Sequence, residues 1–121
     1  MTGTIHYYKL IRDNIPAKIA AAGAECETRI LSDQEFEREL IKKVEEEASG
    51  MSAATTKEEL IEEIADVLDV ITEVKLLKGI TDLEIRAAQE KALQKKGGFT
   101  KKLFLLWSSD DGYKTNEKKG A

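Results

Sequence analysis

Residues 57–78 place the strongest constraint on the fold, because this long segment contains neither proline nor glycine. On a helical wheel at about 100° per residue, its aliphatic side chains cover well over half of the circumference. These side chains are Leu60, Ile61, Ile64, Val67, Leu68, Ile71 and Val74. A helix this apolar is normally buried against other helices. The segment therefore predicts the central helix of a helical bundle.

Capping residues predict two helices before the central one. Pro16 suits the first turn of a helix over residues 16–22, because the N–H that proline lacks has no partner at that position. Ser32 followed by Glu35 has the spacing of a capping box, which predicts a helix over residues 32–49. Phe36, Leu40, Val44 and Ala48 repeat every four residues and give this second helix one apolar face.

Turn residues set the remaining helix boundaries. Small and polar residues over 50–56 predict a short turn, so the helices on either side of it should be antiparallel neighbours. Thr56 is the expected N-cap of the central helix, and Gly79 is expected to end it. A last helix is predicted over residues 82–96, ending at Gly97.

The expected fold class is all-α, an antiparallel helical bundle with minor extended segments near the two ends of the chain. Residues 28–31 are a candidate short strand, and residues 103–107 are either a strand or an apolar segment that docks on the helices. One domain is expected over residues 1–107, followed by a disordered tail over residues 108–121. Oligomerisation should complete the bundle, because short neighbours cannot cover the central helix.

Composition excludes several classes of function. The net charge of −4 argues against binding to duplex nucleic acid. Cys26 and His6 are the only residues of their types, so neither an internal disulfide nor a cysteine–histidine zinc site can form. No apolar run reaches the roughly 20 residues of a membrane helix, and the N-terminus lacks a signal-peptide pattern. A cytoplasmic protein without membrane contact is expected.

A band of carboxylates runs along the polar face of the central helix. Like charges three or four residues apart repel by a few tenths of a kcal/mol per pair. The sequence has no lysine or arginine between Glu59 and Glu73 to relieve this repulsion. A compensating cation is therefore expected from outside the helix. The band consists of Glu59, Glu62, Glu63, Asp66, Asp69 and Glu73.

The preceding helix carries acids near its expected C-terminal end, where the helix dipole disfavours negative charge. Antiparallel packing would bring Glu46 and Glu47 toward Glu63 and Asp66. Partly buried carboxylates that converge cannot all stay ionised without a cation, and Mg²⁺ matches their hard oxygen atoms. Two interpretations follow: a metal site for phosphate chemistry, or two solvated acidic faces.

Four segments in order carry a family resemblance: YKLIRDNIP at 8–16, ETRIL at 27–31, EEIADVLDVI at 62–71 and KGGF at 96–99. They are similar to the YxKLVRDxIP opening, the segment after it, the EELADVLEVI helix with its ExxD metal motif, and the closing RGGF element of one family. The chain thus resembles, over about residues 7–107, the MazG-like branch of the all-α nucleoside triphosphate pyrophosphatase superfamily, which is phosphoribosyl-ATP pyrophosphohydrolase-like.

The resemblance implies a Mg²⁺-dependent hydrolase that converts a nucleoside triphosphate and water to a monophosphate and pyrophosphate. It also implies house-cleaning of non-standard nucleotides by a homodimer or larger homo-oligomer, although no residue identifies the base or the sugar. The implied catalytic and metal-binding residues are Glu46, Glu47, Glu63 and Asp66. The candidates for phosphate contact are Lys9 and Arg12 in the opening motif, and Lys91, Lys95 and Lys96 in the last helix, whose alternative is solvated surface.

One departure from the family pattern leaves other functions open. The first acidic motif of the family reads approximately EExxE, and Gly50 stands where its third acid is expected. A register shift that uses Glu45 and Glu46 would put Ser49 there instead, and one metal ligand is missing in either register. Weaker metal binding, altered substrate choice and loss of catalysis are all compatible with this change. The alternatives are therefore a degenerate relative that binds nucleotide or a protein partner without turnover, and a helical adaptor whose acidic stripe grips a basic protein.

Overall fold

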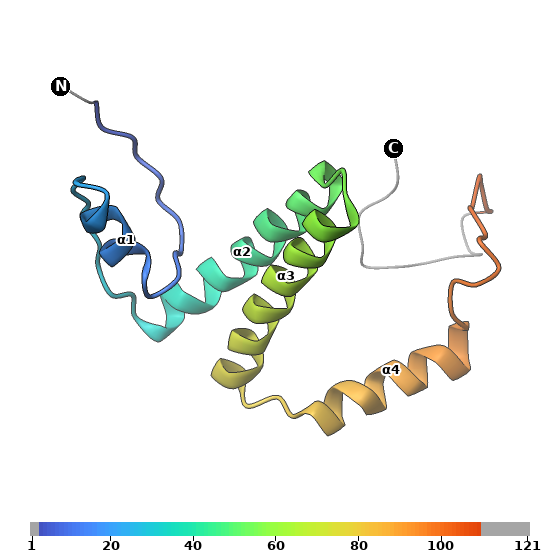
Figure 1. Ribbon diagram of the computed structural model, residues 1–121. Helices are drawn as coiled ribbons and strands as arrows, with labels where there is room; N and C mark the ends of the chain where they lie inside the picture. Colours follow the sequence, from blue (N-terminus) through green and yellow to red (C-terminus); the bar gives the residue numbers. More distant parts are fainter. Residues whose placement is uncertain (1–2, 110–121) are drawn as a thin grey trace. The chain divides into compact units, whose positions relative to one another are not determined.

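The structure is a computed structural model that describes residues 3–109, and its regular structure is entirely helical (Figure 1). The helices are α1 (Ile15–Ala21), α2 (Asp33–Ala53), α3 (Lys57–Lys78) and α4 (Asp82–Lys96). The predicted all-α class is thereby confirmed. The chain forms two compact units that divide after Asp82.

The first unit is built on a hairpin of α2 and α3, which lie side by side along their length (Figure 1). The turn between them is only residues 54–56, so the two helices run antiparallel as predicted. Leu40 of α2, at 3% exposure, is the one fully buried apolar side chain among residues 3–109. Phe36 and Val44, one turn to either side of Leu40, are half-buried. The hairpin seam is therefore a narrow core.

The predicted caps start both long helices. The Ser32 hydroxyl accepts a hydrogen bond from the Glu35 N–H at 3.2 Å, and the Glu35 carboxylate accepts one from the Ser32 N–H at 3.1 Å. This is the reciprocal capping box that the spacing predicted. At α3 the Thr56 hydroxyl accepts from the Glu59 N–H at 3.1 Å, but the Glu59 carboxylate instead accepts from the N–H of Thr55 at 2.9 Å.

The predicted glycines end the helices. Gly79 follows α3 with φ of 65°, a left-handed conformation that glycine adopts without a steric penalty. The next N–H, that of Ile80, donates to the carbonyl of Lys75 at 2.9 Å, which satisfies a carbonyl of the last turn. α1 and α4 end before Gly23 and Gly97, which also have positive φ.

The C-terminal end of α2 differs from the prediction. The helix continues through Gly50 to Ala53, and the N–H of Ala54 still donates to the Gly50 carbonyl at 3.1 Å. Gly50 has an ordinary helical backbone, and the small residues after it do not interrupt the backbone hydrogen bonds of the helix. Residues 45–47 consequently lie more than one turn before the helix end. Because the dipole acts only within the last turn, the dipole argument for a cation at these acids does not hold.

The two candidate strands do not form. Residues 28–31 and 103–107 have no regular structure, because a strand requires a partner with which to exchange backbone hydrogen bonds. Ile30 in the first segment is 98% exposed. Most of the expected disordered tail, residues 110–121, lies outside the described residues. Within the described part of the chain, none of the helices combines the length and apolar character that crossing a membrane requires.

Candidate metal centre

Three carboxylates converge across the α2–α3 hairpin. Glu47 comes from α2, and Glu63 and Asp66 come from successive turns of α3. One carboxylate oxygen from each residue lies within 4.8 Å of the other two, and all three side chains are half-buried. The spacing of three residues between Glu63 and Asp66 puts both on one face of α3. These three residues are called the acidic triad below.

Glu46, the fourth predicted ligand, lies beside the acidic triad without joining it. Its carboxylate accepts hydrogen bonds from the Lys9 ammonium at 3.0 Å and from the Lys43 ammonium at 3.2 Å. These bonds, that of Lys9 foremost, lower the pKa of Glu46 below its usual range. Lys43 also pairs with Glu47 at 3.3 Å. Glu46 thus serves here as an anchor for the N-terminal segment.

Arg12 supplies the cation that the acidic band of α3 lacks. Its Nη2 atom donates to Asp66 Oδ1 at 2.9 Å and to Asp69 Oδ2 at 2.8 Å. The hydrogen bond to Asp69 is the main cause that raises the pKa of Arg12 above its usual value. The expected compensation from outside the helix therefore comes from residue 12. Asp69 was not among the predicted site residues, although its position one turn after Asp66 in the acidic band was a signal.

The charges in this network do not balance. Ion pairs and close approach link five carboxylates, those of Glu46, Glu47, Glu63, Asp66 and Asp69, to three cations, those of Lys9, Arg12 and Lys43. With all groups ionised, two negative charges are left over. Within residues 3–109, the Glu63 carboxylate pairs with no cation. One divalent cation would therefore neutralise the cluster.

The donor set fits a hard divalent ion. Ligand oxygens of one octahedral Mg²⁺ lie about 2.1 Å from the ion, hence at most about 4.2 Å apart. Adjacent ligand oxygens of such an ion are only about 3.0 Å apart, so the oxygens of the acidic triad, which lie within 4.8 Å of one another, would have to move closer together to hold one ion. Three carboxylate oxygens leave the remaining positions to water or to phosphate oxygens, which is the usual mode of Mg²⁺ binding.

The other predicted phosphate contacts lie in the second unit. Lys91, Lys95 and Lys96 are exposed residues of α4, which belongs to the second unit. Residues 96–103 enclose a hollow of about 340 Å³ that includes Lys96.

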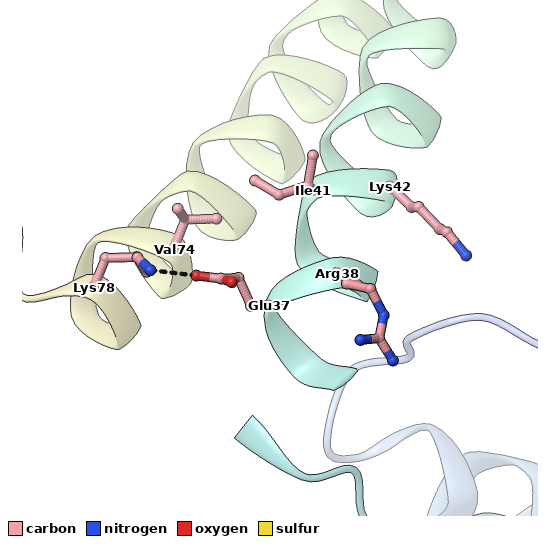
Figure 2. A pocket seen from close by; sticks show the side chains of 6 residues that line it. All are labelled: Glu37, Arg38, Ile41, Lys42, Val74 and Lys78. Carbon is pink, nitrogen blue, oxygen red and sulfur yellow. Dashed lines mark ion pairs between the residues drawn. The ribbon is translucent and has the colours of Figure 1, made fainter. Parts of the chain in front are cut away.

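A larger hollow, of about 450 Å³, opens on the α2–α3 hairpin (Figure 2). Its floor is apolar, with Ile41 and Val74 from opposite helices, and an ion pair between Glu37 and Lys78 borders it. Neither of the two hollows is lined by a residue of the acidic triad. The triad therefore lies on a surface of the hairpin apart from this apolar depression.

Comparison with models of known protein families, with curated proteins and with solved structures finds no match. The inference of function consequently depends on the four sequence motifs and on the geometry of the acidic triad.

Proposed function

We propose that this chain is a Mg²⁺-dependent nucleoside triphosphate pyrophosphohydrolase of the MazG-like kind. The observation that supports this most is the acidic triad with two cations of the opening motif beside it. Lys9 and Arg12 come from one segment, and Glu63 and Asp66 come from another that is far away in the sequence. Both segments are similar to motifs of the family that the chain resembles, and they lie together in the fold.

Phosphate binding would use donors that the present contacts leave available. Arg12 makes both carboxylate contacts through Nη2, so Nη1 and Nε can donate to phosphate oxygens. The Lys9 ammonium has three N–H donors and gives one of them to Glu46. The two side chains would donate hydrogen bonds to phosphate oxygens while Asp66, Asp69 and Glu46 hold them in position.

The reaction is attack of water on the α-phosphorus. The new bond joins the water oxygen to this phosphorus, and the bond to the bridging α–β oxygen breaks, so that pyrophosphate leaves and the monophosphate remains. Bound Mg²⁺ supplies charge neutralisation and a more acidic water. Glu47, Glu63 and Asp66 would hold the ion, and one of these carboxylates would orient the water or accept its proton.

The proposal includes a homodimer or larger homo-oligomer. Within residues 3–109 only Leu40 is fully buried, and one such side chain contributes about 1.5–3 kcal/mol. Ile41, Leu68 and Ile71 are exposed on the helices of the hairpin. Covering these side chains with a second copy would supply the burial that a stable fold requires. The apolar hollow at Ile41 is a natural part of this contact surface (Figure 2).

Pyrophosphate release tests the enzymatic proposal. The wild-type chain is incubated with a panel of standard and modified nucleoside triphosphates, with Mg²⁺ and with a chelator. We expect at least one nucleotide to release pyrophosphate, and we expect this release to require Mg²⁺. Glu63→Gln and Asp66→Asn should each lower the rate by at least about 100-fold, because a removed ligand impairs both metal binding and transition-state neutralisation.

The matched control is Glu62→Gln, which makes the same chemical change on the adjacent position of α3, outside the acidic triad. It should leave the rate within about twofold of wild type. No release from any nucleotide would contradict the enzymatic proposal. Thermal stabilisation by Mg²⁺ and nucleotide without release would instead indicate the binding protein without turnover. Absence of both release and stabilisation would favour the adaptor.

A further inference from the structure

Gly50 lies directly against the carboxylate of Glu63. A Cβ atom built on Gly50 would stand 2.1 Å from Oε2, 2.6 Å from Cδ and 3.1 Å from Oε1 of that side chain. Real Cβ atoms essentially never come closer than 3.0 Å to another heavy atom. Any side chain at position 50 would therefore require the Glu63 carboxylate to move, and this move costs little because the carboxylate is the far end of a flexible side chain.

The backbone of Gly50 gives no reason for a glycine. The residue is inside α2 with an ordinary helical conformation, where glycine costs about 1 kcal/mol relative to alanine. The conformations of Gly23, Gly79 and Gly97, in contrast, have positive φ. What distinguishes position 50 is the space that the missing side chain leaves. That space holds an acidic group from the facing helix.

We infer that Gly50 is a positioning residue, which admits the Glu63 carboxylate against α2 and so completes the acidic triad with Glu47 and Asp66. The inference depends on the proposed metal site. Gly50 is one turn after Glu47 on the same face of α2, so a carboxylate placed there from α3 lies next to Glu47.

The contact with Glu63 gives a structural reason for a glycine at position 50, where the family pattern has an acid. A glutamate at this position would bring its Cβ into the Glu63 carboxylate and place a second negative charge beside it. We therefore expect Gly50→Glu to disturb the acidic triad instead of restoring a missing ligand. The glycine leaves the space that the Glu63 carboxylate occupies, so the placement of Glu63 depends on Gly50.

The test compares Gly50→Ala with Ser52→Ala, which introduces the same side chain two residues later in α2. The first measurement is made without metal. Nuclear Overhauser contacts between the Gly50 α-protons and the Glu63 γ-protons should be present in wild type. In Gly50→Ala the Glu63 γ-proton resonances should shift, and their contacts to position 50 should change. Absence of the contact in wild type would overturn the inference, whatever the result of the metal-binding measurement.

The second measurement is the dissociation constant for Mg²⁺, with Mn²⁺ as a second probe, together with the melting temperature of the metal-free chain. Gly50→Ala should weaken metal binding about 10-fold or more, while the melting temperature stays the same or rises because alanine favours the helix. Ser52→Ala should bind metal like wild type. Equal metal affinity in Gly50→Ala and wild type would overturn the inference.

The two proposals fail in different ways. If wild type shows the contact between Gly50 and Glu63 but binds no divalent ion, the placement of Glu63 is supported and the metal-dependent function is rejected. If wild type binds metal and releases pyrophosphate, and Gly50→Ala does both equally well, the function is supported and the positioning role of Gly50 is rejected.

Discussion

Asp66 is the residue at which the two parts of the candidate site meet. It shares the acidic triad with Glu47 and Glu63, and it also accepts a hydrogen bond from Arg12. Asp69, one turn later, holds the same guanidinium at 2.8 Å, so Arg12 remains beside the triad even if Asp66 turns toward an ion.

Replacing Arg12 tests its proposed contact with phosphate. Arg12→Ala should lower kcat/KM about 10- to 100-fold, mainly through KM, because one charge-assisted contact to the triphosphate is lost. Arg12→Lys should recover only part of this loss, since lysine keeps the charge without the planar fork. Steady-state kinetics of pyrophosphate release measures both effects. Arg86→Ala removes an exposed arginine of α4, in the second unit, and is the control. Unchanged kinetics in Arg12→Ala would remove Arg12 from the site.

The helices show why most of the fold and the approach of Glu47 to Glu63 and Asp66 could be predicted, whereas the partners of Arg12 could not. Helix starts and stops depend on local chemistry, so Ser32, Thr56 and Gly79 indicated boundaries that the structure confirms. The predicted end of α2 at residue 49 was wrong, because a helix can also continue through a glycine, as α2 does at Gly50. The pairing of Arg12 with Asp66 joins residues 54 positions apart, and no local pattern encodes such a contact.

The start of α2 should be sensitive to acid. Hydrogen bonds from the Arg29 guanidinium and from the Ser32 N–H lower the pKa of Glu35 from 4.5 to about 2. Because the folded pKa is below the unfolded one, Glu35 contributes stability fully above about pH 4.5 and loses it as pH falls toward 2. The melting temperature of Glu35→Gln should therefore fall less than that of wild type between pH 4.5 and pH 2.

Circular dichroism melts at several pH values measure this difference. Glu25→Gln, which changes an exposed glutamate outside the helices, should keep the acid sensitivity of wild type. Parallel pH profiles for Glu35→Gln and wild type would show that the capping box and the Arg29 pair do not shift the titration of Glu35.

At the scale of the whole molecule, apolar exposure is the dominant feature. Ile41, which lines the apolar hollow, is 52% exposed, and Leu68 and Leu60 are exposed on α3. Stable assemblies bury about 1,200–2,000 Å² in total. Two long helices with this much uncovered aliphatic surface can supply such an area. The sequence indicated the excess of apolar surface, but it contains no local signal for how many copies share it.

A charge at the apolar hollow should therefore dissociate the proposed assembly. Ile41→Lys should shift the mass in solution toward the monomer and lower the melting temperature, because an interfacial lysine loses hydration without a partner. Light scattering coupled to size-exclusion chromatography measures the mass. Ala24→Lys, in the exposed loop before α2, is the control and should leave the mass unchanged. A wild-type chain that is monomeric at high micromolar concentration would contradict the assembly.

The long sequence separation of the Arg12 contacts has a consequence for how the chain folds. Closing the loop from residue 12 to Asp66 and Asp69 costs more chain entropy than forming the three-residue turn between α2 and α3. We therefore expect the hairpin to form early and the N-terminal segment to attach late. During this interval the nascent chain would present its clustered carboxylates without their arginine. Divalent ions in the solvent would then have access to these carboxylates before Arg12 reaches them.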